Sequence, residues 1–369
     1  MIYILVAIGA AAAAYQLLAL AAGLRQLFLR EKRATKFPPV SILKPIHGLD
    51  PNFYEDIVSH AVLKYPEYEI LFGVSDPEDP ALGAIERLKA EYAGVPIRIV
   101  RSETRSPNRK AGVLGDLAAA ARYPVLVVND SDIRVPADYL ARITAPLEDA
   151  GVGMVTCLYR ARAEGWAGRV EAVGIATDFA PSVLVAPLVG VSEFALGSTM
   201  AFRAADLERI GGFAAIADYI ADDYQLSRRI RGLGRRVVIS KCVVETSVPD
   251  AGWAETWRHQ VRWARTIRLS RGGGYLGLPV TCATLWAGVL AAAGAWPAGA
   301  GLMGLRVAAG LVTGVGVLGD RRALRDCFLI PVRDVAGLAI WAAGLFGSTV
   351  VWRDARRRLD GAGRIVGKA

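Results

Sequence analysis

Aspartates stand directly after two apolar segments of the sequence. Residues 125–128 run into Asn129-Asp130-Ser131-Asp132, and residues 69–74 run into Ser75-Asp76. Two carboxylates two residues apart can face one hard cation, and Mg²⁺ or Mn²⁺ favours oxygen ligands that it shares with substrate phosphates. A lone Asp-x-Asp is more often a turn or a helix cap. Here an apolar strand precedes the Asp-x-Asp motif, and Asp76 follows a neighbouring strand. Both features favour a site for a metal and a phosphate ester.

A further pair of carboxylates, Asp222 and Asp223, begins a predicted helix over residues 222–231. A carboxylate at such a position can cap the helix. It can also act as a general base that takes a proton from an acceptor hydroxyl. We assign the cap to Asp222 and the base to Asp223, and the reverse order fits the sequence as well.

Lys110 lies in Asn108-Arg109-Lys110, where another helix is predicted to begin. A lysine at a helix start can bind phosphate together with the free backbone N–H groups of the first turn. A solvated run of charge explains the same residues equally well, so the sequence leaves both interpretations open.

Residues 253–269 combine aromatic and basic side chains at helical spacing. Trp253, Trp257, Val261 and Ala264 fall on one side, and a row of arginines falls on another, namely Arg258, Arg262, Arg265 and Arg268. This pattern is typical of an amphipathic helix at a membrane surface. In addition, Arg262 and Trp263 could close over a diphosphate, because a guanidinium fork matches its oxygens.

The segments that would hold these residues alternate between strand and helix patterns. Strands are predicted at 40–43, 69–74, 97–100 and 125–128, and helices at 52–63, 81–92 and 110–121. Such alternation indicates an α/β domain built from βαβ units around a mostly parallel sheet. Ligands of open parallel sheets bind beyond the carboxyl ends of the strands, so Asp76 and Asp130 should share one edge. Looser strands are predicted later, at 154–157, 199–202 and 237–239.

Apolar segments flank this domain. Residues 2–24 carry no charge and are long enough for one bilayer crossing. A cleaved signal peptide is the weaker interpretation, because no basic residue precedes the run. Basic residues follow it, which predicts a catalytic domain on the cytoplasmic side of the inner membrane.

Three more apolar runs are found at 276–298, 299–318 and 335–352, the first two separated by a turn at Trp296-Pro297. Three crossings would leave the basic tail, Arg353 and residues 356–358, outside, against the positive-inside rule. One run should therefore be re-entrant or interfacial. We expect this of residues 323–352, which contain Arg333 and Asp334.

The composition excludes several other classes. The net charge of +9 is partly juxtamembrane, and anionic lipid headgroups account for it without nucleic acid. No basic-aromatic RNA-binding signature is present, so nucleic acid is not an expected partner. Four scattered cysteines without a CxxC pair indicate a reduced compartment and no zinc site.

Taken in order, the motifs resemble those of the ceramide glucosyltransferase family, a branch of inverting GT-A transferases related to family 2. They are Asp76, Asp130 in Asn-Asp-Ser-Asp, Asp223 in Ala-Asp-Asp-Tyr, and His259-Gln260-Val261-Arg262-Trp263. The similarity runs from about residue 40 to residue 271. It implies a Rossmann-like GT-A domain over 38–250, a transmembrane helix over 1–29, an amphipathic helix over 251–274, and membrane segments with a basic tail over 275–369.

The resemblance also implies the chemistry. Asp76 would contact the uridine of a UDP-sugar, Asp130 and Asp132 would hold Mg²⁺ or Mn²⁺ and the diphosphate, and Asp223 would be the base. Arg262 and Trp263 would bind the donor diphosphate and the acceptor, with Lys110 a further donor contact. His259 stands where the family usually has Gln or Arg, which puts its donor contact in doubt, although Gln260 could substitute.

The expected reaction is inverting transfer of one hexose to a membrane lipid hydroxyl, with UDP-glucose and ceramide as first choice. The alternative is UDP-N-acetylglucosamine transfer to a hopanoid, because the full Asp-x-Asp is closer to bacterial members. The acceptor pocket should include residues 165–198, which are largely apolar from 179 to 194.

Other classes fit less well. A processive polysaccharide synthase would need a channel that three or four apolar segments do not supply. A dinucleotide-binding oxidoreductase would need Gly-x-Gly-x-x-Gly after the first strand, and this sequence does not have that motif there. A non-enzymatic membrane protein with a nucleotide-binding domain would not need three separate aspartates. The sequence leaves the oligomeric state open.

Overall fold

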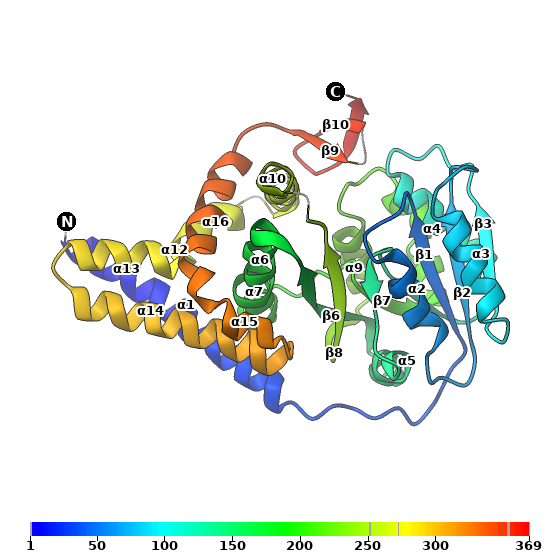
Figure 1. The fold of residues 1–369 in the computed structure, drawn as a ribbon, viewed down its shortest axis with the longest axis horizontal. Helices are drawn as coiled ribbons and strands as arrows, with labels where there is room; N and C mark the ends of the chain where they lie inside the picture. The colour runs from blue at the N-terminus through cyan, green and yellow to red at the C-terminus, as the bar shows by residue number, and fades with distance from the viewer. Residues whose placement is uncertain (1, 251, 272, 353–354, 369) are drawn as a thin grey trace.

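An eight-stranded sheet forms the centre of the protein in a computed structural model that describes residues 2–250, 252–271, 273–352 and 355–368 (Figure 1). The strand order is β3-β2-β1-β4-β7-β6-β8-β5. The first four strands in this order are parallel, and β7 is antiparallel to both β4 and β6. The strands are β1 Val40–Ile46, β2 Tyr68–Val74, β3 Ile97–Arg101, β4 Val125–Val128, β5 Ile133–Arg134, β6 Val152–Ala163, β7 Met200–Arg203 and β8 Arg236–Val248.

Helices cover both faces of the parallel half, which explains why its strands are nearly continuous apolar runs. The helices α2 (Phe53–Ala61), α3 (Leu82–Glu91) and α5 (Tyr139–Thr144) pack on one face. The helices α4 (Arg109–Ala120), α8 (Ala204–Arg209) and α9 (Asp222–Gly232) pack on the other. The predicted α/β class and its mostly parallel sheet are therefore confirmed.

Three apolar helices form a bundle that extends away from the sheet (Figure 1). They are α1 (Ile2–Phe28), α13 (Ala283–Ala292) and α14 (Trp296–Leu311), the last continuing to Val317 in a π-helical turn. The chain reverses direction between α13 and α14 at Gly294, whose φ is +84°. The prediction that this turn lies at Trp296-Pro297 was therefore wrong. Pro297 instead lies in the first turn of α14, where its missing N–H costs no hydrogen bond.

Among the residues that the structure describes, four helices are long and apolar enough to cross a membrane, or five if the bent pair Gly274–Thr281 and Ala283–Ala292 is one span. One of the four, Gly165–Val189, was not predicted as a helix. It comprises α6 (Gly165–Gly174), a π-helical turn, α7 (Ala180–Val185) and a 3-10 turn. It leaves the sheet after β6 and returns to it at β7.

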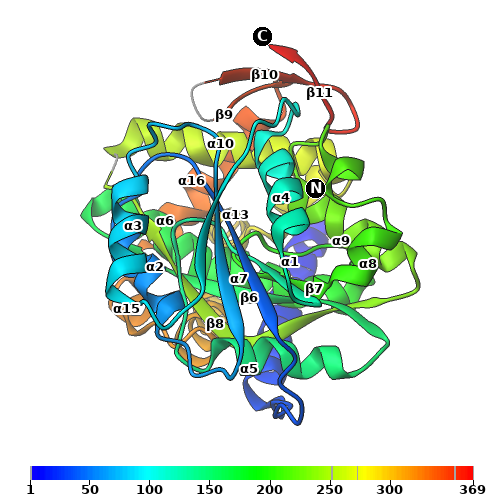
Figure 2. The same cartoon turned by 90° about the vertical axis from the view of Figure 1, so that its right-hand side faces the viewer.

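The C-terminal region differs from its prediction. The third apolar run, within the segment expected to be re-entrant or interfacial, is not one helix, because α16 ends at Gly344 and a three-stranded sheet follows. We name residues 349–368 the C-terminal ribbon; it contains β9 (Thr349–Trp352), β10 (Ala355–Leu359) and β11 (Ile365–Lys368). Of the predicted tail, Arg353 lies outside the described residues, and Arg356–Arg358 belong to β10. The ribbon lies above α10 and α4, against the α/β domain (Figure 2).

The predicted amphipathic helix is α10 (Gly252–Arg271). Its apolar side does not face one environment along its length. Trp253 and Trp257 are 58% and 42% exposed, whereas Val261 and Ala264 are buried against Tyr275 and α16. Only the first half of α10 thus has aromatic side chains free to enter a lipid interface.

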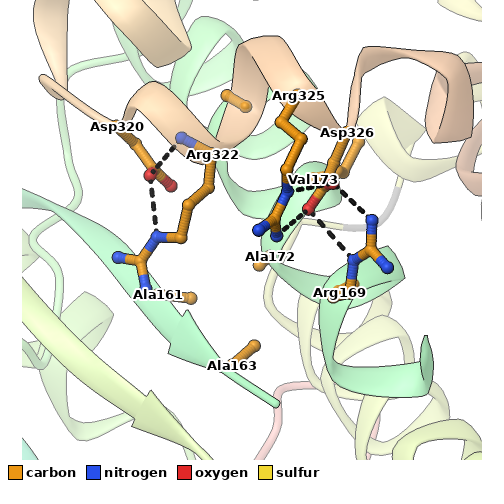
Figure 3. Close-up of a pocket in the computed structure, with 10 residues that line it drawn as sticks. Ala161, Ala163, Arg169, Ala172, Val173, Asp320, Arg322, Arg325 and Asp326 are labelled. Atoms are coloured by element: carbon orange, nitrogen blue, oxygen red, sulfur yellow. Dashed lines mark hydrogen bonds and ion pairs between the residues drawn. The ribbon is translucent and has the colours of Figure 1, made fainter. Parts of the chain in front are cut away.

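Charged side chains fix the segment between α14 and α16 (Ile330–Gly344) to the start of α6 (Figure 3). The Asp326 carboxylate accepts hydrogen bonds from Arg169 at 2.5 Å and from Arg325 at 2.9 Å. Asp320 pairs with Arg322 at 3.1 Å beside them. The guanidinium groups of Arg325 and Arg169 lower the pKa of Asp326 to about 2. The cavity between them is only about 10 Å³, so this is an anchoring cluster.

Candidate active site

Lys110 joins carboxylates from two distant parts of the chain. Its Nζ lies 2.7 Å from Asp130 Oδ1 and 3.1 Å from Asp222 Oδ2. Burial alone would lower the pKa of Lys110, but the charges of Asp130 and Asp222 outweigh it and raise the pKa. With a side chain only 9% exposed, Lys110 is part of a buried ion-pair cluster and not of a solvated charge run.

The position of Lys110 follows from the cap of α4. Asn108 is the N-cap residue, and its Oδ1 accepts a hydrogen bond from Ala111 N at 3.0 Å. This places Lys110 in the first turn of the helix. Asn108 also donates from Nδ2 to Tyr219 O at 2.7 Å, which fixes the chain just before Asp222. The two halves of the cluster are therefore aligned by one buried amide.

Asp130 and Asp132 follow β4 as predicted. The hydroxyl of Thr246 on β8 donates to Asp132 Oδ2. Burial and the neighbouring charge of Asp130 raise the pKa of Asp132 to about 6. Beneath the turn, the buried Lys44 donates from Nζ to Asp130 O at 3.0 Å. Its own pKa is lowered to about 8 by burial, so its charge is held there at a cost.

Asp223 has the environment of a general base. Burial and the adjacent charge of Asp222 raise its pKa to about 7, partly opposed by Lys110. A carboxyl group with such a pKa can accept a proton near neutral pH. The cap assigned to Asp222 was wrong, because Ala221 is the N-cap residue and no side chain caps α9. Asp222 is instead the second carboxylate on Lys110.

A divalent cation fits the groups at this site. Asp130 and Asp132 offer carboxylate oxygens. The pKa of Asp132 is raised first by burial and then by the negative charges of Asp130 and Asp50, and a bound cation would offset those charges. In the described part of the chain, no three His, Cys, Asp or Glu side chains converge to hold a metal. An ion here would therefore take further ligands from phosphates and water, as Mg²⁺ usually does.

Gly197 closes one side of the cluster. A Cβ atom at this position would lie 2.7 Å from Asp130 Oδ2 and 3.6 Å from Lys110 Nζ. The loop is held there because Asn129 Nδ2 donates to Ser198 O at 2.6 Å. The absence of a side chain at residue 197 thus keeps space beside the outer oxygen of Asp130.

Asp76 follows β2, the strand next but one to β4, and is exposed. Its Oδ1 accepts a hydrogen bond from Glu78 N at 3.0 Å, which orders the turn around it. The nearby Asp79 is buried and accepts from Gly48 N at 2.8 Å. Asp79 is thus a loop-fixing residue, whereas Asp76 is accessible to a ligand at the sheet edge.

His259 and Gln260 make contacts that the sequence did not indicate. Both approach Glu171 Oε1 on α6, His259 Nδ1 at 3.2 Å and Gln260 Nε2 at 2.9 Å. The imidazole packs on Trp263 with ring centroids 4.4 Å apart. Glu171 is 4% exposed, so α10 is tied to a buried carboxylate. Any donor contact of His259 or Gln260 stays a prediction, and the same holds for Arg262 and Trp263.

Four residues of this region were missed by sequence reasoning, namely Lys44, Glu171, Gly197 and Thr246. A signal existed for two of them. Lys44 is a lone charge inside an apolar strand, and Glu171 interrupts an apolar run. Gly197 and Thr246 carried no local signal, because their roles depend on side chains more than 60 residues away in sequence.

Comparison with known proteins agrees with this geometry. The sequence profile of Glycosyl transferase family 21 matches residues 1–365. Ceramide glucosyltransferase 1 of Caenorhabditis elegans is 28% identical over 206 residues, which are 55% of this chain and 44% of that protein. Ceramide glucosyltransferase 3 of the same organism is 29% identical over 219 residues, 58% of this chain and 47% of that protein. The chain spans about half the length of these curated relatives.

A solved structure shares the fold over nearly the whole chain. It is the mannosyltransferase PcManGT from Pyrobaculum calidifontis, in complex with GDP-Man and Mn²⁺. The TM-score is 0.57 at 22% identity, over 91% of this chain and 97% of that one. At this identity the likeness establishes the GT-A fold and nothing finer.

Proposed function

We propose, since the chain belongs to glycosyltransferase family 21, that it moves one hexose from a UDP-sugar to a hydroxyl group of a membrane lipid. Of the two reactions expected from the sequence, we favour UDP-glucose and ceramide, because the curated relatives are ceramide glucosyltransferases. The observation that carries the proposal is the cluster in which Lys110 joins Asp130 to Asp222, next to Asp223 with its pKa of about 7.

The residues that follow strands β2 and β4 at the sheet edge would bind the sugar donor. Asp130 and Asp132 would hold a divalent cation, which when bound stabilises the negative charge of the departing UDP. Asp76 would contact the uridine from its exposed position after β2. Lys110 holds Asp130 in place and adds positive charge near the diphosphate. Gly197 lets the loop backbone approach Asp130 more closely than any residue with a side chain could.

The acceptor end belongs to Asp223. Its carboxylate takes the proton of the lipid hydroxyl as that oxygen attacks the anomeric carbon. The bond from this carbon to the phosphate oxygen breaks in the same displacement, and its electron pair leaves with UDP. One in-line displacement inverts the configuration, so an α-linked donor yields a β-glycoside. Arg262 and Trp263 would close over the donor diphosphate and the acceptor from α10.

The arrangement of helices supports a membrane topology with an odd number of crossings. Both ends of α16 adjoin the catalytic domain, through the Asp326–Arg169 pair before it and the ribbon after it. The helix Gly165–Val189 is likewise flanked by β6 and β7 of one sheet. We therefore assign crossings to α1, to the bent pair Gly274–Thr281 and Ala283–Ala292 taken as one span, and to α14 alone, with α16 along the membrane face. The N-terminus then lies opposite a cytoplasmic domain.

This topology is open to a labelling test. Single cysteines at Ala293, in the hairpin turn, and at Gly361, in the ribbon, would be treated with a membrane-impermeant maleimide on intact cells. We expect labelling at residue 293 only. Equal labelling of both residues from outside would contradict the topology.

The function is tested by supplying both substrates to membranes that contain the protein. Radiolabelled UDP-glucose and UDP-N-acetylglucosamine would each be offered with ceramide, diacylglycerol or bacteriohopanetetrol, and lipid products separated by chromatography. We expect glucosylceramide with a β-linkage, absent with the Asp223→Asn variant. A hopanoid product would establish the alternative substrate pair. Failure of every pair with correctly folded protein would contradict lipid glycosylation.

A further inference from the structure

The chain immediately before the candidate base has no helix or strand of its own. Residues 217–221 connect the 3-10 helix Phe213–Ile216 to α9, which begins with Asp222 and Asp223. We name residues 217–221 the base loop. Because Asp222 must reach Lys110, the placement of this loop decides where both carboxylates lie.

The C-terminal ribbon holds one side of the base loop by backbone hydrogen bonds. Ile220 N donates to Gly363 O at 3.1 Å, and Ile365 N donates to Asp218 O at 2.7 Å. Between them Tyr219 and Arg364 form an antiparallel bridge. Arg364 Nε also donates to the Tyr219 hydroxyl at 2.9 Å. The ribbon thus pairs with the loop as a neighbouring strand would.

Apolar packing reinforces this pairing. Ile220 is buried in a cluster with Val350, Leu359 and Ile365, one residue from each strand of the ribbon. Removing such apolar side chains from water favours the docked state. Leu359 and Val350 are 3% and 1% exposed, so the ribbon is docked through a continuous apolar contact.

The opposite side of the base loop is held by the cap of α4. Asn108 N donates to Ala217 O at 2.8 Å, and its side chain donates to Tyr219 O at 2.7 Å. The loop therefore lies between the first turn of α4, which contains Lys110, and the ribbon. Loss of either contact would free the chain that sets the Lys110–Asp222 distance.

The ribbon is also attached to α10. Arg265 Nη1 donates to Thr349 O at 2.8 Å, and Arg268 Nη2 donates at 2.5 Å to the carbonyl of Gly347, two residues before the ribbon begins. These arginines follow Arg262 and Trp263 on the same helix. One element, far from the predicted motifs in sequence, is thus bonded both to the base loop and to the helix that carries the Arg-Trp motif.

We propose that the C-terminal ribbon is a positioning element of the active site, in which Gly363, Arg364 and Ile365 align the base loop so that Asp223 faces the acceptor hydroxyl. The proposal rests on the proposed function for the role of Asp223. The ribbon residues touch neither substrate; they act through the backbone of residues 218–220.

Two variants of the full-length protein test this role, with one matched control. Ile365→Pro removes the N–H that binds Asp218 O, and Arg364→Leu removes the bond to Tyr219. Arg358→Leu makes the same change at an exposed arginine of β10. We expect kcat to fall about 10-fold or more for Ile365→Pro, and several-fold for Arg364→Leu, since misplacing a reacting group by about 1 Å can cost 10²-fold. The affinity for UDP with Mn²⁺ should stay within about twofold for all three, because the donor contacts are on other elements.

Hydrogen exchange of the 217–224 backbone gives a readout that does not need activity. We expect faster exchange there in Ile365→Pro than in Arg358→Leu. Unchanged kcat and unchanged exchange would overturn the proposal, as would an equal loss of UDP affinity and kcat, which marks a general folding role. If the wild type transferred no sugar, the proposed function would fail, and the exchange rates alone would decide whether the ribbon orders the loop.

Discussion

Two charge clusters in this protein are built differently. In the membrane-side cluster, Arg306 on α14 pairs with Asp334 on α16 at 2.7 Å, and Thr284 donates to the same carboxylate at 2.5 Å. The remaining guanidinium nitrogen donates to Thr177 O at 2.6 Å. One cation meets one anion, and hydrogen bonds satisfy the remaining groups.

At the sheet edge the charges do not balance. Four carboxylates, those of Asp130, Asp132, Asp222 and Asp223, share Lys110 and the buried Lys44. Burial, together with this excess of negative charge, raises the pKa of Asp132 to about 6 and that of Asp223 to about 7. A balanced cluster supports architecture, whereas an excess of one charge leaves groups ready to bind a cation or take a proton. Burial alone therefore does not distinguish a functional site from a structural one.

The largest expected effect comes from removing the base. Asp223→Asn keeps the shape of the side chain but cannot accept a proton, so kcat should fall by about 10³-fold. UDP and Mn²⁺ affinity, measured by calorimetry, should change little. A purified variant with normal turnover would refute the assignment of Asp223 and remove the functional meaning of the unbalanced cluster.

Removing the Asp130 carboxylate should weaken the metal-dependent binding of UDP. Asp130→Ala deletes one proposed metal ligand, and we expect metal-dependent UDP affinity to fall about 100-fold, the upper end of what neighbours of a metal site contribute. Calorimetry with UDP and Mn²⁺ measures this directly. Asp138→Ala, an exposed aspartate on the same segment, is the control. Equal affinity in both variants would show that no cation is held at Asp130.

Removing the positive charge of Lys110 should change the pH dependence of the reaction. Lys110 lowers the pKa of Asp223, so in Lys110→Met the pKa of Asp223 rises above its value of about 7. The base is then protonated over a wider range, and the acid limb of kcat/KM moves to higher pH. At pH 7 we expect a loss of about 10-fold, equivalent to roughly 1.4 kcal/mol. An acid limb that stays in place would mean that Asp223 does not set it.

The balanced cluster should respond in stability and hardly in catalysis. Asp334→Leu leaves Arg306 buried and unpaired, which we expect to cost about 3 kcal/mol or more of stability in detergent. The double variant Arg306→Met with Asp334→Leu should regain most of that loss, because no lone charge remains. If kcat of the folded fraction fell as far in Asp334→Leu as in Lys110→Met, the two clusters would not differ in function.

Much of the sheet and half of the site could be predicted from local pattern. Residues 125–128 are an apolar run of strand length, and in parallel sheets the residue after such a run lies at the ligand edge. Asp130 and Asp132 follow from that rule without any tertiary information. The start of α9 was predictable in the same way, and so was the position of Asp223, whose role as the base stays a prediction.

Pairings across long sequence distances could not be predicted this way. Asp222 was assigned to a cap because that role is local, whereas its actual partner Lys110 lies on another helix. His259 gave no sign that Glu171, 88 residues away, would bind it. Hydrophobic periodicity reports which face of an element is buried, but not which element covers it.

The sequence by itself determined the α/β class, the strand-end carboxylates, the family motifs and the presence of membrane-length helices. These depend on residue type and spacing within about 20 residues. Only the tertiary structure decided that Lys110 joins Asp130 to Asp222, that Glu171 holds α10, and that residues 349–368 form a ribbon on the base loop. Those arrangements depend on contacts between elements far apart in the chain, and local composition carries no record of which distant partner a side chain or a free strand edge will find.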